Sequence, residues 1–326
     1  MAYSAEVIKR ARNRLALMRT DRESENQRQL MEAYNRIPRL REIDRQLRQT
    51  MAVAAQAVFI QGGSSDALVQ AMQENLDLQQ ERAELIKEKF EEGFLDETPI
   101  CSQCGGNGYI GATMCECLKE LCRQEQKKEL SVLSGGKENF SQFRLDYYSD
   151  QFDPRYGASP RNIMERVFQN SRRYATTFTE NSGNLMLVGG TGLGKTFLSA
   201  CIADAVADRG YSVMYETASR LFSKLEQAKF SGDEESRKEA AKYTACDLLI
   251  LDDLGTEMPG QFVTAALYSL LNERLLSGKP MVISTNLNAD EMGRRYSPQI
   301  ASRLQGEFTR LVFVGDDIRL IKNRRV

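Results

Sequence analysis

The chain has 326 residues, 41% of them hydrophobic, and its 44 Lys and Arg residues nearly balance 45 Asp and Glu residues. This length is more than one hydrophobic core usually serves, so two or three domains are expected, and the hydrophobic content is enough for a folded core. A formal net charge of −1 excludes a uniformly basic surface, so any nucleic-acid contact must come from a local patch.

The first residues, Met1 to Arg14, lack the apolar run of a secretory signal, and no stretch reaches the ~18 apolar residues of a membrane span. We therefore expect a cytoplasmic protein without a membrane partner. The reducing cytosol makes a disulfide framework a poor explanation for the seven cysteines, so metal binding is the better interpretation.

Residues 1–98 are predicted to form an all-α region, because apolar residues such as Ile37, Leu40, Ile43 and Leu47 recur at helical spacing. Residues 1–50 hold twelve Lys and Arg against seven Asp and Glu, whereas residues 51–100 hold three against ten. A basic arm is thus able to fold back on an acidic arm through a turn at residues 62–65. Two solvated helices without a partner explain the same charges equally well.

Four cysteines crowd into the next segment as Cys101-x-x-Cys104 and Cys115-x-Cys117. The two pairs are separated by ten residues that include four glycines, which permit tight turns around one ion. Four thiolates favour tetrahedral, structural Zn²⁺, so we predict a zinc knuckle over residues 99–119. Reduced free thiols are the alternative, and Cys122 is the substitute ligand if Cys117 cannot reach the ion.

Residues 120–158 are interpreted as a helix followed by a linker. A short charged helix is expected from Leu118 to Leu130, and a Ser- and Gly-containing segment then runs through Gly135 and Gly136 to Tyr148.

From residue 159 to residue 326 short apolar runs alternate with helical stretches, which predicts a parallel sheet with crossover helices. The expected strands are Leu185–Val188, Ser212–Tyr215, Leu248–Leu251, Met281–Ser284 and Leu311–Val314. The predicted fold class is therefore α/β, a P-loop nucleotide-binding domain preceded by the helical region and the zinc knuckle.

The segment after the first of these strands fits the phosphate-loop pattern G-x-x-x-x-G-K-[ST] and opens a helix. Its residues are Gly189, Gly190, Thr191, Gly192, Leu193, Gly194, Lys195 and Thr196, and Phe197 completes the predicted ATP-binding set. The glycines let backbone N–H groups close around phosphate oxygens at a helix N-terminus, while Lys195 reaches the β and γ phosphates. Thr196 would hold Mg²⁺. An ordinary glycine turn does not explain the strand–loop–helix context.

Acidic residues end a second buried strand, where Asp252 and Asp253 follow Leu251. We expect Asp252 to hold Mg²⁺ and Asp253 to act on the attacking water. The base in related ATPases is usually the longer Glu, so Glu257 is the alternative to Asp253.

Three further polar residues are expected to act on the nucleotide. Asn286 follows the strand that ends near Ser284 and would orient the water. Arg303 and Arg319 would place guanidinium charge on the γ phosphate, Arg303 from a neighbouring subunit and Arg319 from the same subunit.

The order of these motifs resembles AAA+ ATPases of the DnaC/DnaI helicase-loader family over most of the chain. The residues that carry the resemblance are the phosphate loop, Asp252-Asp253-Leu254-Gly255, Ser284-Thr285-Asn286, Ser302-Arg303 and Gly315-Asp316-Asp317-Ile318-Arg319. The helix from Ile37-Pro38 to Ile43-Asp44, the cysteine pairs and Tyr147-Tyr148-Ser149 look like the loaders of Gram-positive bacteria, their phages and mobile elements. The resemblance implies that Asn286 is sensor 1, Arg303 the arginine finger and Arg319 sensor 2.

The resemblance also implies a function, namely an ATP switch that delivers the hexameric replicative helicase onto single-stranded DNA through self-association of AAA+ subunits. A transposition helper that resembles IstB is one alternative, because the same ATPase core serves both. A nucleotide-gated adaptor that does not hydrolyse ATP is another, because Asp253 replaces the usual Glu.

Candidates for contact with single-stranded DNA are basic and aromatic residues in two places. They are Arg220, Lys224, Lys229 and Phe230 after the second strand, and Arg319, Lys322, Arg324 and Arg325 near the end of the chain. Solvated helix faces explain these residues nearly as well, so the sequence assigns no DNA site.

Overall fold

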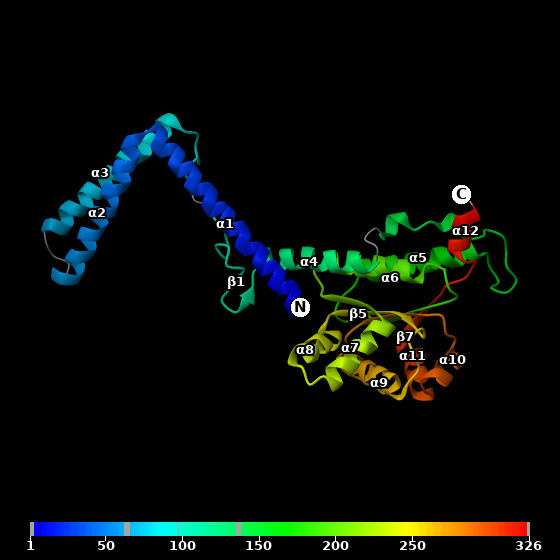
Figure 1. Cartoon of the computed structure of the whole chain (residues 1–326). Coiled ribbons are helices and arrows are strands. Elements are labelled where there is room, and N and C mark those ends of the chain that lie inside the picture. Colours follow the sequence, from blue (N-terminus) through cyan, green and yellow to red (C-terminus); the bar gives the residue numbers. More distant parts are fainter. Residues whose placement is uncertain (1–2, 62–65, 97, 135–137, 325–326) are drawn as a thin grey trace. The chain divides into compact units, whose positions relative to one another are not determined.

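The computed structural model describes the chain except residues 1–2, 62–65, 97, 135–137 and 325–326 (Figure 1). The chain divides into two compact units, one made of residues 1–12 and 118–326 and the other of residues 13–117. The proposed turn at residues 62–65, the linker glycines Gly135 and Gly136, and Arg325 lie outside the described residues. No helix of the described part is long and apolar enough to cross a membrane.

The unit of residues 13–117 is mainly helical, as predicted. Its helices are α1 (Ala5–Arg36, which begins in the other unit), α2 (Pro38–Gln61) and α3 (Asp66–Lys89). Helix α1 ends before Pro38 because a proline disfavours helical backbone in the residue that precedes it, and Pro38 then suits the first turn of α2.

Helices α2 and α3 pack along each other (Figure 1). Leu40 and Ile43 of α2 are buried. The Arg39 guanidinium donates to both Glu81 carboxylate oxygens at 2.8 Å, so the basic arm does pair with the acidic arm. The opposite pairing also occurs, because Arg82 Nε lies 2.7 Å from Asp44 Oδ1.

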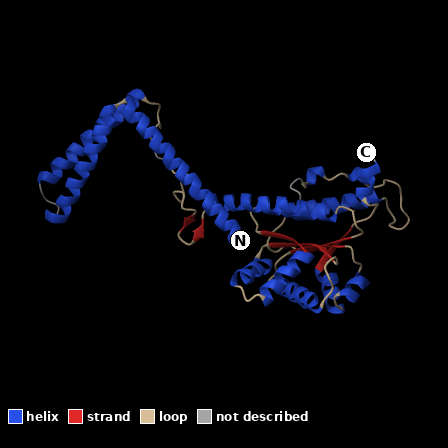
Figure 2. Cartoon of the chain, in the orientation of Figure 1, coloured by secondary structure: helices blue, strands red, loops and turns tan. Residues whose placement is uncertain are grey.

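The larger unit contains a five-stranded sheet in the order β4-β5-β6-β3-β7, in which all neighbouring strands are parallel. The strands are β3 (Asn184–Val188), β4 (Val213–Thr217), β5 (Leu248–Leu254), β6 (Met281–Thr285) and β7 (Phe308–Val312). Figure 2 shows them in red between layers of helices. The predicted α/β class with a parallel sheet is confirmed.

Helices cover both faces of the sheet, because successive strand residues point to opposite sides. Leu187 packs in a cluster with residues of α5 (Pro160–Thr176) and α6 (Lys195–Asp208). Met186 packs in the second cluster, which includes residues of α7 (Ala218–Phe230), α8 (Glu234–Ala245), α9 (Gln261–Leu276), α10 (Ala289–Arg295) and α11 (Pro298–Glu307). The chain continues from β7 to α12 (Ile318–Arg324).

Several strand boundaries differ from the prediction by one to three residues, and the largest differences are that β5 ends at Leu254 rather than Leu251 and that β7 begins at Phe308 rather than Leu311. Asn184 of β3 already pairs with Phe308, and the exposed Thr309 and Arg310 lie within the strand. Because β7 is an edge strand, part of it faces solvent and carries polar residues, so a search for continuous apolar runs places its start too late.

A fully buried arginine, Arg274 on α9, ties several elements of this unit together. Its guanidinium donates to the carbonyl oxygens of Tyr243 at 2.8 Å, Cys246 at 3.1 Å and Pro280 at 2.6 Å. Two of these carbonyls lie at the carboxyl end of α8, where a positive charge is favourable. Arg274 therefore joins α8 and α9 to the start of β6.

Candidate functional site

The phosphate loop connects β3 to α6. A Cβ atom at Gly189 would lie 2.5 Å from the Phe313 carbonyl oxygen, so only glycine permits this close approach. Gly192 has a φ of +73°, and a Cβ there would lie 1.9 Å from Asp317 Oδ1. Because Gly189 and Gly192 have no side chain, the segment that contains Phe313 and Asp317 is able to pack directly against the loop.

Lys195, the first residue of α6, is buried, with 5% of its surface exposed. Its ammonium group donates to the carbonyl oxygens of Gly189 at 2.9 Å and Gly190 at 2.7 Å. Burial lowers the pKa of Lys195, and the charges of Asp253 and Asp252 act in the opposite direction. The side chain is therefore held along the loop in which a phosphate group would be bound.

Asp252 and Asp253, near the carboxyl end of β5, differ sharply in environment. Asp252 is only 2% exposed, whereas Asp253 is exposed and has a φ of +54°. Burial and the charge of Asp252 raise the pKa of Asp253, although Lys195 opposes this shift. The Asp253 carboxyl faces a cavity, and that position suits a group that acts on water.

Glu257 is fully engaged away from that cavity. Its Oε2 accepts from the Gly255 N–H at 2.9 Å, and its Oε1 accepts from Arg295 Nε at 3.3 Å and from the Tyr296 hydroxyl. Because Glu257 is ion-paired with Arg295 and binds the backbone of Gly255, its position suits a support for the loop after β5. This geometry favours Asp253 over Glu257 as the proposed base.

The cavity has a volume of about 470 Å³ and opens at the carboxyl ends of the parallel strands, where ligands of α/β proteins usually bind. Ten of the predicted residues line it, namely Thr191, Gly192, Leu193, Gly194, Lys195, Thr196, Phe197, Asp253, Asn286 and Arg319. Of the remaining predicted residues, Gly189 and Gly190 accept from the Lys195 ammonium through their carbonyl oxygens, and Asp252 is buried near the end of β5.

Sequence reasoning missed one wall of the cavity, because residues 138–148 were interpreted as linker. This segment, the aromatic strap, contains two 3₁₀ turns, Phe140–Gln142 and Leu145–Tyr147. Glu138, Gln142, Phe143, Arg144, Tyr147 and Tyr148 of the strap line the cavity. The segment has four aromatic residues within nine positions, which is an unusual density for a linker. This density is the sequence signal that could have indicated a packed segment.

Tyr148 joins the aromatic strap to the phosphate loop. It is 1% exposed, and its hydroxyl donates to the Leu193 carbonyl oxygen at 2.9 Å. Its ring lies against Gly315 and stacks with Phe143 at 5.9 Å between ring centroids. Burial raises the pKa of Tyr148 above its ordinary value, so the hydroxyl stays a donor.

Helix α12 also contacts the phosphate loop. The Ile318 N–H donates to the Gly192 carbonyl oxygen at 3.0 Å, and the Asp317 carboxylate accepts from the Arg319 N–H at 2.9 Å. Arg319 is exposed and lines the cavity. The predicted sensor 2 residue is thus positioned by backbone contacts to the phosphate loop.

Arg303 does not line the cavity. It lies on α11, where its guanidinium carbon is 4.6 Å from the centre of the Tyr268 ring of α9. Arg303 is partly exposed, so a second molecule is able to reach it. This exposed position on α11 is compatible with the proposed action of Arg303 on the nucleotide of a neighbouring subunit.

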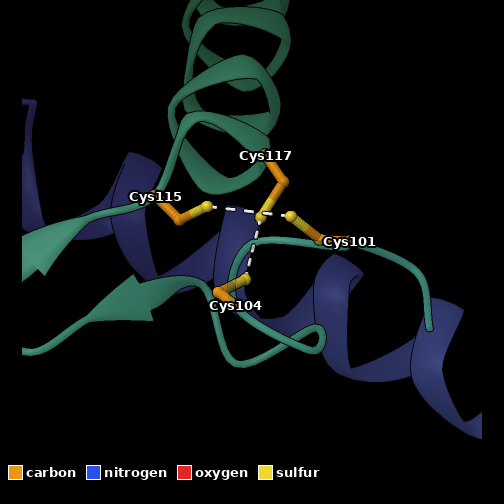
Figure 3. Close-up of side chains that lie close together, drawn as sticks. All are labelled: Cys101, Cys104, Cys115 and Cys117. Atoms are coloured by element: carbon orange, nitrogen blue, oxygen red, sulfur yellow. Dashed lines mark hydrogen bonds between the residues drawn. The ribbon is translucent and has the colours of Figure 1, made fainter.

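The four predicted cysteine ligands come together in the smaller unit. Figure 3 shows the side chains of Cys101, Cys104, Cys115 and Cys117 pointing toward one another. All four sulfur atoms lie within 4.8 Å of one another, with Cys101 to Cys115 at 3.7 Å and Cys104 to Cys117 at 3.4 Å. Cys122, the substitute ligand, is not part of this cluster.

The cluster is built by a hairpin and a helix start. Strands β1 (Tyr109–Ile110) and β2 (Thr113–Met114) pair antiparallel between the two cysteine pairs, and Cys117 lies in the first turn of α4 (Glu116–Ser134). Gly111 sits at the hairpin turn with a φ of +58°, which glycine adopts at little cost.

The donor set fits Zn²⁺. A tetrahedral ion with Zn–S bonds of about 2.3 Å places its sulfur ligands about 3.8 Å apart, close to the observed separations. Burial raises the pKa of Cys104, but the Gly108 N–H and the Cys117 thiol, which donate to its sulfur, outweigh burial and lower that pKa to about 6. A thiolate, the form that binds metal, is therefore favoured at Cys104.

Comparisons with known proteins cover the larger unit. Residues 152–303 match the family described as IstB-like ATP binding protein. The replicative helicase loader DnaC of Escherichia coli (strain K12) is 23% identical over 154 residues, which are 47% of this chain and 63% of that protein. An insertion sequence IS21 ATP-binding protein of Pseudomonas aeruginosa is 27% identical over 153 residues, which are 45% of this chain and 57% of that protein. The chain thus spans less than two thirds of the length of either relative.

Among solved structures, the crystal structure of the DnaC helicase loader is similar with a TM-score of 0.45 and 20% identity, covering 54% of this chain and 98% of that one.

Proposed function

We propose, from the premise that this chain carries an IstB-like ATP-binding domain of the DnaC type, that it loads a hexameric replicative DNA helicase onto single-stranded DNA under the control of ATP. The observation that supports this best is the cavity where Lys195, Asp253, Asn286 and Arg319 converge on one phosphate loop. A protein with this arrangement binds ATP and is equipped to hydrolyse it.

The polar residues at the phosphate loop and the strand ends then have roles in hydrolysis. Lys195 neutralises charge on the β and γ phosphates, and Asp253 orients the attacking water with the help of Asn286. Thr196 and Asp252 would hold Mg²⁺, which draws electron density from the phosphate oxygens when it is bound. Arg319 stabilises the γ phosphate from the same chain.

The smaller unit is proposed to dock on the helicase. Val69, Met72 and Leu76 of α3 are exposed, and their spacing places them on one face of the helix. An exposed apolar stripe of this kind is typical of a protein interface. The cysteine cluster would hold one structural Zn²⁺ in the same unit.

Contact with single-stranded DNA is proposed at the end of α7. Phe230 is exposed, and the Lys229 ammonium lies 5.6 Å from its ring centre and 5.4 Å from that of Phe262. A cation between two aromatic rings offers both phosphate attraction and base stacking. Phe230→Ala should weaken binding to oligo(dT), measured by fluorescence anisotropy, while Phe152→Ala, another exposed aromatic, should leave it unchanged.

Nucleotide turnover tests the enzymatic part of the proposal. Lys195→Ala should lose binding of ATP, because the phosphates lose the only ammonium group of the loop. Asp253→Asn should keep binding and lose hydrolysis. A wild-type protein that binds ATP but shows no multiple turnover, even with helicase and DNA, would instead be a nucleotide-gated adaptor.

Pull-down of purified replicative helicase tests the docking part. Met72→Glu should abolish capture of the helicase, because a charge at the centre of an apolar interface is costly to bury. Gln70→Glu, on the same helix, is the matched control and should not. The similarity to the IS21 protein supports a second candidate, a transposition helper. Wild-type chain that ignores the helicase but stimulates a transposase would favour it.

A further inference from the structure

Asp252, the proposed metal ligand, is held by one hydroxyl group from each neighbouring strand. The Tyr215 hydroxyl of β4 donates to Asp252 Oδ2 at 2.8 Å. The Ser284 hydroxyl of β6 donates to Asp252 Oδ1. Strand β5 lies between β4 and β6 in the sheet, so the carboxylate is fixed from both sides.

Strand register explains why these two side chains reach the acid. Thr217 pairs with Asp252 and Tyr215 pairs with Ile250, so alternation along parallel strands puts Tyr215 and Asp252 on the same face of the sheet. Ser284 pairs with Leu187, whose side chain packs with α6 on that face. The two hydroxyls and the Asp252 carboxylate therefore lie on the same face of the sheet, which allows both hydrogen bonds.

Ser284 also connects the two acids. Its Oγ accepts from the Asp253 N–H at 2.9 Å while it donates to Asp252, so the direction of both hydrogen bonds is fixed. The same contact anchors Asp253, whose left-handed φ of +54° is uncommon for a residue other than glycine.

Within the part of the chain that the structure describes, the buried Asp252 carboxylate makes no ion pair. Among the residues that the structure describes, no Lys or Arg nitrogen lies within 4.0 Å of Asp252, and Lys195 donates to loop carbonyl oxygens instead. A buried ionised carboxylate is costly unless it is paired or coordinates a metal. Two neutral donors reduce this cost and leave the charge of Asp252 for an incoming cation.

We propose that Tyr215 and Ser284 are positioning residues that orient Asp252 toward the Mg²⁺ of bound nucleotide, an inference that rests on the proposed ATP-binding function. Outer partners of metal ligands fix the ligand's orientation, and their removal typically costs 10–100-fold in metal affinity. Tyr215 acts through its hydroxyl alone, since its ring packs in the core beside Ile250.

The test is equilibrium binding of a fluorescent ADP analogue to the full chain, titrated with MgCl₂ and repeated in EDTA. Tyr215→Phe should raise the Mg²⁺ concentration for half-maximal enhancement of nucleotide affinity by about 10-fold or more, with affinity in EDTA unchanged. Ser284→Ala should behave in the same way. If Tyr215→Phe does not fold, as judged by thermal melting, Ser284→Ala decides.

Tyr243→Phe is the matched control, because Tyr243 is also buried and donates to a buried carboxylate at 3.3 Å, but that carboxylate belongs to Glu216 and not to Asp252. It should titrate like wild type. If Tyr215→Phe and Ser284→Ala both match this control, the inference is overturned.

Asp252→Asn tests separately whether Asp252 binds Mg²⁺ and whether Tyr215 and Ser284 orient it. It should abolish the enhancement by Mg²⁺. If it keeps the full enhancement, Asp252 is not the metal ligand and the proposed metal site fails with the inference. If it loses the enhancement while the hydroxyl variants keep theirs, only the inference fails.

Discussion

The phosphate loop and the cysteine cluster are two candidate ligand sites that depend on their ligands to different degrees. The loop is supported by a packed sheet, by Tyr148 of the aromatic strap and by Ile318 of α12. The cluster rests on two-residue strands and a few turns, and few apolar side chains are buried among residues 99–117. The packing of the larger unit should therefore hold the phosphate loop in place with or without nucleotide. The backbone around the cysteine cluster should instead depend on bound metal for its conformation.

The reason is the amount of apolar surface that each region buries. Five strands and their helices bury two continuous hydrophobic clusters. This packing is enough to hold the backbone N–H groups of the loop in the positions that phosphate binding requires. A knuckle of about twenty residues cannot do this, and small domains of that size usually need a metal or disulfides.

The largest expected effect is removal of zinc. Protein purified without chelators should carry about one zinc per chain, and Cys104→Ser should release it and expose residues 99–117 to hydrogen exchange, because structural zinc sites contribute about 10–16 kcal/mol in isolated peptides. ADP affinity should stay within about two-fold of wild type. Cys122→Ala, a buried cysteine outside the cluster, is the control and should keep its zinc. If residues 99–117 stay protected from hydrogen exchange after the zinc is lost, the cysteine cluster does not depend on its metal more than the phosphate loop depends on its nucleotide.

The second effect concerns Arg303, which is proposed to act on the nucleotide of a neighbouring subunit. Arg303→Ala should keep nucleotide binding but lose about 10³-fold or more in turnover with helicase and single-stranded DNA, if Arg303 acts on a neighbouring subunit. Mixing it with Asp253→Asn should restore some hydrolysis, because one interface then joins an intact site to an intact finger. Full activity of Arg303→Ala alone would leave Arg303 as a surface residue stacked on Tyr268.

The third effect concerns how much the buried Arg274 contributes to the stability of the sheet and its helices. Arg274→Met should lower the free energy of unfolding by about 3 kcal/mol, because the carbonyl oxygens of Tyr243, Cys246 and Pro280 would lose their buried donor. Urea unfolding followed by circular dichroism measures this. Arg172→Met, which changes an exposed arginine, should be within about 0.5 kcal/mol of wild type.

The smallest effect is expected inside the loop. Gly192→Ala should weaken ADP binding by about 10-fold, because the new Cβ meets the Asp317 carboxylate and the backbone φ is unfavourable for alanine. Adding Asp317→Ala should recover part of the loss, since the clash disappears while the strained φ remains. Equal losses in the single and double variants would show that Asp317 does not contact the loop in solution.

Local patterns in the sequence indicated most of the fold of the larger unit. Strand–loop–helix context at Gly189 to Thr196 and the apolar runs before Asp252 and Asn286 predict a parallel sheet, because these features depend on spacing along the chain. The apolar runs predict the start of β7 three residues too late, because an edge strand carries polar residues, which an apolar run does not detect.

By itself the sequence determined the phosphate loop, the order of the acids and the spacing of the cysteines, since each is a short run whose chemistry is local. Only the tertiary structure decided what surrounds them. Residues 138–148 form a cavity wall because their aromatic rings pack on the loop and on α5, and Tyr215 reaches Asp252 because β4 lies beside β5 in register. Glu257 faces Tyr296 rather than the cavity for the same reason. Such contacts join residues dozens of positions apart, and no local pattern specifies which distant partner the folded chain brings near.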